Sequence, residues 1–331
     1  MVLCHDITEI IPGKSKGVAF RKGHIIREED VPKLLNLGKA HIYVWENQPG
    51  MLHENDAAIR LSRTMAKGGL KFTEPKEGKV NLLAAVDGLL KIDVERLEAV
   101  NEIDQIVVGT LHTDRVVKAG EQVAGCRVVP LVIAEEKIIQ AERICQETGG
   151  IIEVKPLKHH KAGLVTTGGE VFSGRIKDAF GPIIKKKLET LGSTLVKQVF
   201  VPDDVEKIAQ AVQEFKVQGM DLILTTGGMS VDPDDLTPTG LKTAGAEIVA
   251  YGAPVLPGAM FLLAYLEGTP VLGLPGCVMY HKTTIFDLIL PRVLCGEALT
   301  RRDLVKLGHG GLCLNCEVCT FPHCHFGKAG K

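Results

Sequence analysis

ILTTGGMSVDPDDLTPT, residues 223–239, joins the end of an apolar run to two adjacent glycines and then to an acidic segment. The apolar run, which begins at Asp221, is typical of a buried parallel strand. Gly227 and Gly228 permit positive φ angles and carry no side chain that would keep a ligand from the backbone. The carboxylates that follow are Asp232, Asp234 and Asp235. Bare backbone amides beside carboxylates are typical of a metal-assisted phosphate or anhydride site, although a glycine turn before a solvated acidic loop would read the same.

Strand and helix signals alternate on both sides of this stretch. Strands are predicted at 163–167, 194–201, 221–225 and 270–274, and helices at 178–191, 203–217, 237–244 and 278–294. This alternation predicts an α/β fold with a parallel sheet between two layers of helices. Ligands of such folds bind beyond the carboxyl ends of the strands, where loops 166–171, 225–237 and 274–280 would converge.

Four segments of this region, in order, resemble the molybdopterin-binding domain shared by the two late enzymes of molybdenum cofactor synthesis. One of these enzymes adenylylates molybdopterin, and the other inserts molybdate into the adenylylated product. The 223–239 stretch resembles the TTGG–S–x–D–x–TP loop of that domain. The segments TTGGEV (166–171), VPDD (201–204) and GLPG (273–276) resemble its TGDE, V-x-D-D and LPG motifs. The resemblance implies a three-layer, parallel-sheet molybdopterin-binding domain. Short apolar runs that alternate with turns at 78–93 and 105–133 predict a β-rich accessory domain before it.

The resemblance also implies roles for individual residues. Contacts to molybdopterin are expected from Thr167, Gly168, Gly169, Glu170, Thr226, Gly227, Gly228, Ser230, Pro275 and Gly276. Catalytic roles are expected for Asp235, Asp232 and Asp178, and Mg²⁺ would be held by Asp232, Asp234 and Asp235. Helix capping is an equal expectation for Asp178, and capping is the main expectation for Thr237. Cys277 follows the LPG turn, where an inert loop cysteine is the main expectation; the alternative is a thiol that contacts substrate, whose pKa His281 would lower.

Departures from the motifs leave the reaction open. Asp232 follows Val231 where the inserting enzymes carry V-G, whereas the D-L-T-P ending favours the adenylylating enzyme. The PG–P loop is altered to PGAM at 257–260. The expected ligands are therefore molybdopterin or adenylyl-molybdopterin, with molybdate and ATP as co-substrates. Two alternatives are a non-catalytic cofactor carrier or sensor that docks a molybdoenzyme, and a relative of nucleotide pyrophosphatases.

Length and composition set the remaining expectations. A chain of 331 residues predicts two or three domains. The predicted divisions are a small α/β unit (1–50), the β-rich accessory domain (51–150), the molybdopterin-binding domain (151–298) and a Cys-rich tail (299–331). Within the first 150 residues a strand at 41–45, a hairpin at 116–124 and a helix at 135–147 are predicted. A net charge of −1 argues against a general nucleic-acid binder, and no apolar run has the length of a membrane span. A cytoplasmic homo-oligomer is expected.

Four of the nine cysteines crowd into the tail, at Cys313, Cys316, Cys319 and Cys324. Two C-x-x-C steps that share a cysteine let a short loop wrap one metal centre. The spacing fits neither an iron–sulfur loop nor a zinc knot fully, so an Fe–S cluster and Zn²⁺ are both predicted candidates. A disordered tail with exposed thiols is the alternative.

Overall fold

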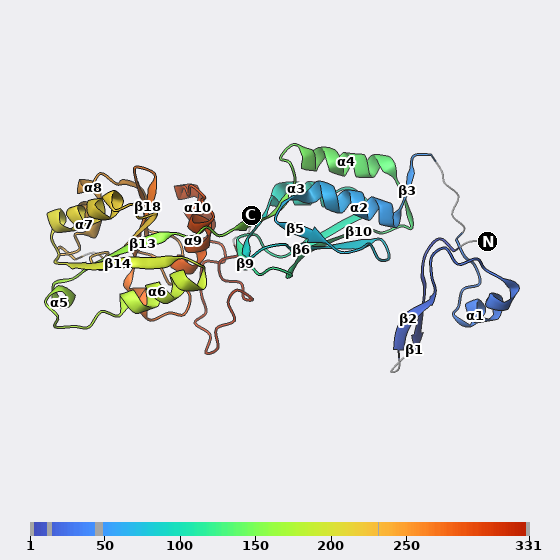
Figure 1. The fold of residues 1–331 in the computed structure, drawn as a ribbon, viewed down its shortest axis with the longest axis horizontal. Helices are drawn as coiled ribbons and strands as arrows, with labels where there is room; N and C mark the ends of the chain where they lie inside the picture. The colour runs from blue at the N-terminus through green and yellow to red at the C-terminus, as the bar shows by residue number, and fades with distance from the viewer. Residues whose placement is uncertain (1–2, 12–14, 44–48, 231, 329–331) are drawn as a thin grey trace. The chain divides into compact units, whose positions relative to one another are not determined.

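The fold was analysed in a computed structural model that describes residues 3–11, 15–43, 49–230 and 232–328. The chain divides into two compact units; in Figure 1 most of unit 1 is coloured from blue to green, and the main part of unit 2, from residue 155 onward, from green to red. Unit 1 comprises Met1–Val86, Lys91–Leu111 and Ala119–Val154, and unit 2 comprises Asp87–Leu90, His112–Lys118 and Lys155–Lys331. Among the described residues no helix has the length and apolar character that crossing a membrane requires.

Unit 2 is built on a six-stranded sheet in the order β14-β13-β15-β18-β17-β16. The first four are parallel: β14 (Thr194–Val201), β13 (Lys161–Thr167), β15 (Leu222–Thr226) and β18 (Thr269–Leu274). The last two, β17 (Leu262–Leu266) and β16 (Glu247–Tyr251), run antiparallel to their neighbours. This antiparallel edge was not predicted. Leu262, the first residue of β17, pairs with Gly273 near the end of β18, so the segment before β17 reaches the carboxyl edge of the parallel strands.

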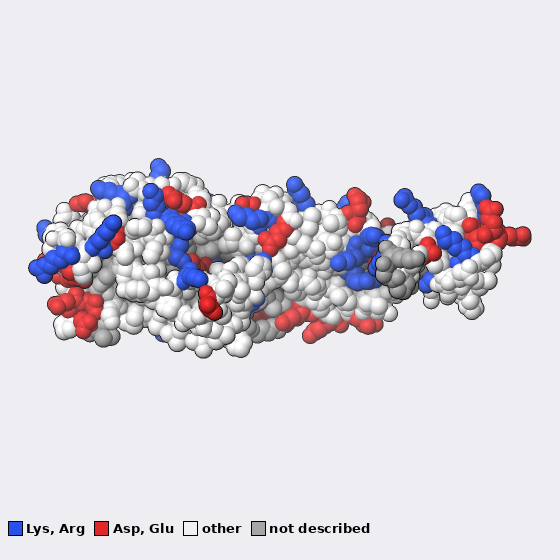
Figure 2. Space-filling view, turned by 90° about the horizontal axis from the view of Figure 1, so that it is seen from below, with Lys and Arg blue, Asp and Glu red and all other residues white. Residues whose placement is uncertain are grey.

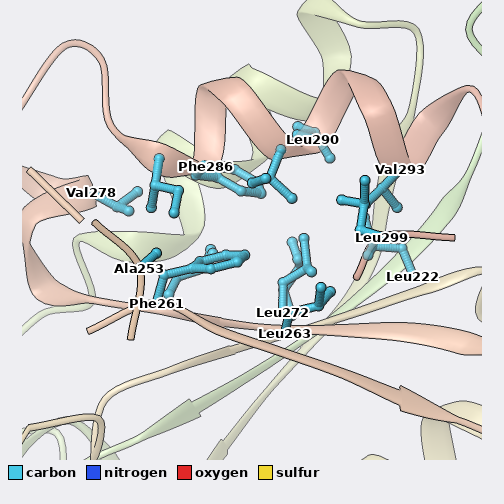
Figure 3. Close-up of a cluster of buried hydrophobic side chains, with 14 of the residues drawn as sticks. Leu222, Ala253, Phe261, Leu263, Leu272, Val278, Phe286, Leu290, Val293 and Leu299 are labelled. Atoms are coloured by element: carbon cyan, nitrogen blue, oxygen red, sulfur yellow. The ribbon is translucent and has the colours of Figure 1, made fainter. Parts of the chain in front are cut away.

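Helices cover both faces of this sheet, so the predicted three-layer α/β fold is confirmed. One face packs against α6 (Phe180–Thr190), α9 (Ile285–Leu294) and α10 (Arg301–Lys306). Figure 3 shows this core, where Phe261 and Leu263 of the sheet side face Phe286 and Leu290 of α9. The other face packs against α7 (Val205–Val217) and α8 (Thr237–Thr243), with Phe215 at its centre.

The single helix predicted over 278–294 is wrong. The segment instead forms a 3₁₀ turn over Gly276–Met279, and a separate helix, α9, begins at Ile285. Thr284 caps α9, since its hydroxyl accepts a hydrogen bond from the Phe286 amide at 3.2 Å, and Asp287 accepts one from the Thr284 amide at 2.7 Å. This reciprocal capping box fixes a new helix start inside an apolar run.

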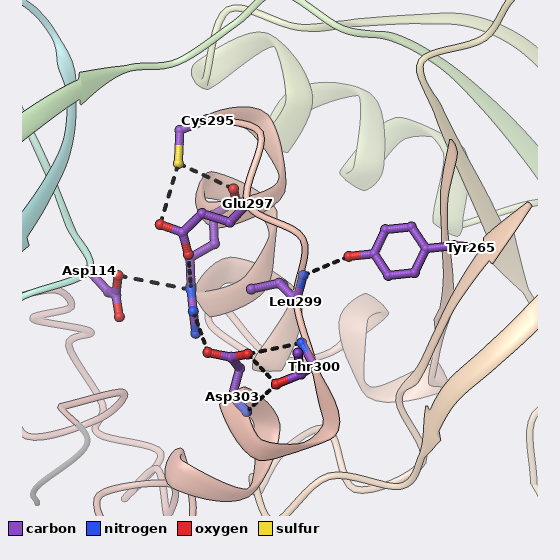
Figure 4. A network of polar contacts seen from close by, with 8 residues as sticks. Asp114, Tyr265, Cys295, Glu297, Leu299, Thr300 and Asp303 are labelled. Atoms are coloured by element: carbon purple, nitrogen blue, oxygen red, sulfur yellow. Dashed lines mark hydrogen bonds and ion pairs between the residues drawn. The ribbon is translucent and has the colours of Figure 1, made fainter. Parts of the chain in front are cut away.

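A buried arginine holds the segment that follows α9. The Arg292 guanidinium pairs with Glu297 and Asp303 at 2.8 Å each and with Asp114 at 3.9 Å (Figure 4). Burial opposes the charge of Arg292, but these three carboxylates outweigh burial and raise its pKa. The chain after α9 is thereby fixed against the body of unit 2.

Unit 1 contains a hairpin and a larger sheet. Strands β1 (Ile7–Ile11) and β2 (Ser15–Phe20) pair beside α1 (Val31–Asn36) around a small apolar core that includes Leu34. A second sheet has the order β5-β6-β10-β8, with α2 (Glu54–Met65) against it, so the predicted β-rich region is confirmed. Its strands are β5 (Leu70–Phe72), β6 (Lys79–Ala84), β10 (Gln122–Val128) and β8 (Ile106–Thr110). The other elements of unit 1 are a 3₁₀ turn (Glu28–Asp30), β3 (Met51–His53), β4 (Ala66–Gly68), α3 (Val94–Asn101), β11 (Val132–Ala134) and α4 (Glu135–Gln146). Strands β7 (Gly88–Ile92) and β12 (Ile152–Pro156) have residues in both units, whereas β9 (Arg115–Val117) and α5 (Gly169–Phe172) belong to unit 2.

Two predictions in the first 150 residues fail. The hairpin over 116–124 is wrong, because β9 pairs with β7 whereas β10 pairs with β6 and β8. The turn at Gly120 therefore connects strands of different sheets. The strand predicted at 41–45 is absent from residues 41–43, and residues 44–45 lie outside the described part of the chain.

Candidate functional site

The two glycines after β15 form a turn that other parts of the domain clamp in place. Gly227 and Gly228 have φ angles of +84° and +55°. A Cβ at Gly227 would lie 2.3 Å from the Thr167 carbonyl oxygen at the end of β13, so only glycine fits. On the other side, the Thr237 hydroxyl donates to the Gly227 carbonyl at 2.9 Å, and its amide donates to the Gly228 carbonyl at 3.1 Å. Thr237 is fully buried and holds the turn, but the capping role expected of it is wrong, because the cap residue of α8 is Leu236, without a side-chain hydrogen bond.

This turn forms one wall of a cavity of about 570 Å³ beyond the carboxyl ends of β15 and β18. The cavity brings together six of the predicted site residues: Gly227, Gly228, Ser230, Asp235, Pro275 and Gly276. The other lining residues are Phe180, Met229, Leu256, Pro257, Gly258, Ala259, Met260 and Cys277. Most of these are apolar, whereas the glycine turns and Asp235 supply polar groups. The cavity thus suits a ligand with an apolar ring and an anionic end.

The residues that the sequence did not assign come mainly from the segment before β17. Leu256 to Met260 reach the cavity because β17 runs opposite to its neighbours. The altered PG–P motif at 257–260 was the signal that could have identified them. Phe180 is the first residue of α6, and the sequence gave no signal for it.

The acidic loop lies differently from the predicted metal cluster. Asp235 lines the cavity, and its carboxylate accepts a hydrogen bond from the Asp232 amide at 2.9 Å. Asp232 and Asp234 are not among the lining residues. No group of three or more His, Cys, Asp or Glu side chains in the described chain is arranged to hold a metal ion. Burial and the nearby charge of Asp235 raise the pKa of the Tyr251 hydroxyl, which donates to the Met229 carbonyl at 2.9 Å.

Asp178 belongs to a hydrogen-bonded network under α6. Its carboxylate accepts from the amides of Phe180 at 2.9 Å and Gly181 at 3.0 Å, which makes it the cap of that helix. Gln198 donates from one amide nitrogen to Asp178 and to the Thr166 hydroxyl, both at 2.9 Å. The capping role expected for Asp178 is therefore present, and its catalytic role stays a prediction.

Two more predicted residues of this region lie deeper or further along. Thr226 is buried, and its hydroxyl donates to the Thr166 hydroxyl at 3.2 Å. Thr167 is buried with its hydroxyl 3.4 Å from that of Thr237. Both hold strand ends together and are not among the residues that line the cavity.

The first predicted loop, Gly168 to Glu170, lies at the carboxyl end of β13 and outside the lining of the cavity. The Gly169 amide donates to the Asp203 carboxylate at 2.8 Å, which ties this loop to the segment after β14. Because β13 is the neighbour of β15 in the sheet, the loop lies at the same sheet edge as the cavity. The loop 168–170 can therefore contact a ligand that extends beyond the turn at Gly227 and Gly228.

Cys277 is not activated by His281, in keeping with the inert loop cysteine that was the main expectation. Burial raises the pKa of the Cys277 thiol, and His281 is not one of the groups that act on it. His281 lies in the break between the 3₁₀ turn and α9, where its ring hydrogen-bonds the Asn315 side chain at 2.9 Å. Cys277 therefore contributes an ordinary thiol to the cavity wall.

Charged side chains of both signs are interspersed over the face drawn in Figure 2. Helix α6 carries three consecutive lysines, at 185–187. Lys187 is largely buried and pairs with Asp287, whereas Lys185 is exposed near Glu189 at 3.9 Å. The described residues on that face form no continuous basic area of the kind that binds nucleic acid.

Comparison with known proteins agrees with the geometry. Residues 163–294 match the family model described as "Probable molybdopterin binding domain", so the resemblance seen in the sequence is confirmed for this region. Residues 1–46 match a model described as "Domain of unknown function (DUF8806)".

Curated relatives match across about half of this chain. A molybdopterin molybdenumtransferase of Staphylococcus aureus (strain COL) is 30% identical over 168 residues, which cover 48% of this chain and 40% of the relative. A protein of the same name from Synechococcus elongatus is 28% identical over 185 residues, or 53% of this chain and 46% of the relative. The chain thus spans less than half the length of either relative.

Solved structures also align with part of the chain. The molybdopterin biosynthesis enzyme MoaB of Thermus thermophilus is 20% identical over 42% of this chain and 98% of its own, with a TM-score of 0.35. The molybdopterin biosynthesis Mog protein of Mycobacterium ulcerans is 25% identical over 40% of this chain and 92% of its own, with a TM-score of 0.34.

Proposed function

We propose that the cavity binds molybdopterin or its adenylylated form, and that the chain acts late in molybdenum cofactor synthesis by transfer at the molybdopterin phosphate. The name shared by the curated relatives supports molybdate insertion as the reaction. Adenylylation with ATP is the second candidate, because the D-L-T-P sequence at 235–238 resembles the adenylylating enzyme.

The observation that carries this proposal is that two glycine turns meet at one cavity whose lining is mainly apolar. Backbone N–H groups near Gly228 and Gly276 can bind phosphate oxygens without adding charge or side-chain bulk. Phe180, Met229 and Met260 offer an apolar surface on which a flat ring can rest. A phosphorylated pterin combines these two features in one molecule.

Asp235 makes a cation necessary for such a ligand. A carboxylate in the cavity wall repels a bound phosphate unless a cation lies between the two. Mg²⁺ is commonly held by one or two carboxylates together with substrate phosphates, so a complete protein cage is not needed. Asp235 would hold Mg²⁺ from the cavity wall, and its carboxylate is positioned by a hydrogen bond from the Asp232 amide. When bound, Mg²⁺ would neutralise charge that develops on the transferring phosphate oxygens.

The test uses the full chain in two incubations, one with molybdopterin, Mg²⁺ and ATP, and one with adenylyl-molybdopterin and molybdate. We expect product in the second incubation, or in the first if adenylylation is the reaction. Asp235→Asn is expected to lower kcat/KM by about 100-fold or more. Asp221→Asn is the matched control, since Asp221 lies at the opposite end of the β15 region and accepts a hydrogen bond from the Lys161 amide at 2.9 Å.

The outcomes separate the alternatives. Tight binding of molybdopterin without product in either incubation would make the chain a carrier or sensor. Turnover of an ADP-ribose-type dinucleotide would identify a pyrophosphatase relative. A folded protein that does not bind molybdopterin at all contradicts the proposal. We also propose a cytoplasmic homo-oligomer, whose mass light scattering would measure, and handover of cofactor to a molybdoenzyme.

A further inference from the structure

The Cys-rich tail surrounds a second cavity in unit 2, of about 560 Å³. All four tail cysteines line it, together with two histidines: Cys313, Cys316, Cys319, Cys324, His281 and His325. Six sulfur- or imidazole-bearing side chains around one cavity form a donor set typical of thiophilic metals. As placed, no three of them are close enough to hold an ion. Coordination would therefore require the loop to contract.

The tail loop, residues 313–325, lacks regular secondary structure. Leu314 and Val318 are 67% and 74% exposed, so the apolar side chains at its tip are not buried. Its base is fixed, since Phe326 is buried in the core of unit 2 and the Gly327 amide donates to the Gly310 carbonyl at 3.0 Å. A structureless loop of this length inside a folded region commonly depends on a functional ligand for its order.

The tail loop contacts two chain segments that help to line the first cavity or directly follow its lining residues: 256–260 and 276–283. At its base, the Leu256 amide donates to the Gly311 carbonyl at 2.8 Å, and the Cys313 amide donates to the Leu256 carbonyl at 2.8 Å. Leu256 itself lines the first cavity. A contraction that moves Cys313 would therefore act directly on that wall.

Further along, the loop contacts the segment that follows Cys277. Asn315 bonds the His281 ring at 2.9 Å, and the Cys319 sulfur lies 3.5 Å from the Thr283 hydroxyl. Lys282 donates to the Glu317 carbonyl at 3.4 Å. These contacts join the loop to the turn that carries Gly276 and Cys277 in the first cavity.

We propose that Cys313, Cys316, Cys319 and Cys324 bind one thiolate-ligated metal centre, and that this centre restrains the two wall segments, 256–260 and 276–283. Its thiolate chemistry fits a zinc ion or an iron–sulfur cluster. The metal centre regulates the cavity to which molybdopterin binding was assigned, so its functional meaning rests on the proposed function. Its existence and its effect on the two segments do not.

The test therefore uses neither molybdopterin nor turnover. The full chain is purified without oxygen, stripped with a chelator, and divided between two treatments. One portion receives Zn²⁺ in competition with a coloured chelator, and the other receives Fe²⁺ and sulfide and is followed by visible absorption. We expect one zinc ion or one cluster per chain, with the successful treatment identifying the metal. The double variant C316S/C319S is expected to lose about 100-fold or more in affinity, whereas Cys295→Ser is unchanged.

Cys295 is a matched control because it lies outside the second cavity, where its sulfur contacts the Arg292 carbonyl at 3.2 Å. Alkylation followed by mass spectrometry gives a second measurement on the unaltered chain, in which metal protects the four tail thiols and leaves Cys295 reactive. Hydrogen exchange then reads the coupling, and we expect amides in 256–260 and 276–283 to exchange about 10-fold more slowly with metal. Failure to retain metal under both treatments, or equal retention by C316S/C319S, overturns the site. Retained metal with unchanged exchange in both segments overturns the coupling.

Discussion

Replacing the buried Thr237 by valine tests whether one hydroxyl holds the glycine turn of the candidate site. Valine keeps the shape of the side chain but removes the donor that lies 2.9 Å from the Gly227 carbonyl. A buried acceptor left without its donor costs about 1–3 kcal/mol. We therefore expect Thr237→Val to destabilise the turn by about 2 kcal/mol, which corresponds to about 30-fold more frequent opening.

Hydrogen exchange of the full chain, followed by mass spectrometry, measures this opening directly in peptides that cover 226–237. Thr237→Ser is the matched variant, because serine keeps the hydroxyl and loses only a methyl group, worth about 1 kcal/mol. Exchange in these peptides should be about 30-fold faster in the valine variant and much closer to that of the unaltered protein in the serine variant. If valine and serine give the same exchange rates, the hydroxyl does not hold the turn.

Two further predictions concern stability. Gly227→Ala places a Cβ 2.3 Å from the Thr167 carbonyl and should lower the free energy of unfolding by about 1–3 kcal/mol, measured by calorimetry. Gly219→Ala is its control, since Gly219 has a φ of +72° with open space around it, so an equal loss in both variants would exclude the close contact as the cause. For Asp303, burial opposes ionisation, but hydrogen bonds from Thr300 and Arg292 outweigh it and lower the pKa to about 2. This carboxylate stabilises the fold above about pH 4 by about 2 kcal/mol, and the contribution is lost as pH falls towards 2. Acid titration of Asp303→Asn by circular dichroism should lack that component, and the same acid dependence in both proteins would contradict the assignment.

The parallel part of the sheet was predictable because β13, β15 and β18 are mainly apolar and buried, and because the mixed strand β14 leads into the VPDD segment. The antiparallel edge was not. The turn between β17 and β18 is made by Glu267 and Gly268, with φ angles of +46° and +81°. Two-residue hairpin turns usually have the sequence Asn-Gly or Asp-Gly, so Glu-Gly is only a weak indication of a hairpin. Without the turn, the run before it read as one apolar segment.

The break before α9 carried a signal that the apolar pattern concealed. Thr284 and Asp287 have the spacing of a capping box, which is a recognised helix start. The surrounding sequence is apolar throughout, and periodicity alone therefore favoured one long helix. The capping box satisfies the first backbone amides of α9, so the helix can start at Ile285 without loss of hydrogen bonds. Residues 280–284 then lie outside the helix, where they contact the tail.

The candidate site was predicted in part. Loops that leave parallel strands converge at one sheet edge by topology, so Gly227 and Gly276 could be brought together from sequence alone. The acidic residues could not be sorted in this way. Whether a carboxylate faces a cavity, as Asp235 does, or caps a helix, as Asp178 does, depends on side-chain direction within a loop.

The opposite direction of β17 gives the domain an independent means of changing its ligand. Two loops that leave the sheet, after β15 and β18, carry the glycine turns of the cavity, and the turn at Gly227 is constrained by the Thr167 carbonyl. Another wall comes from the segment between Tyr251 and Leu262, which enters the sheet and is held by different contacts, among them the hydrogen bond from the Leu256 amide to the Gly311 carbonyl. A longer or shorter segment between β16 and β17 would change the size of the cavity and so the size of the ligand that fits, while the glycine turns proposed to bind phosphate would keep their geometry.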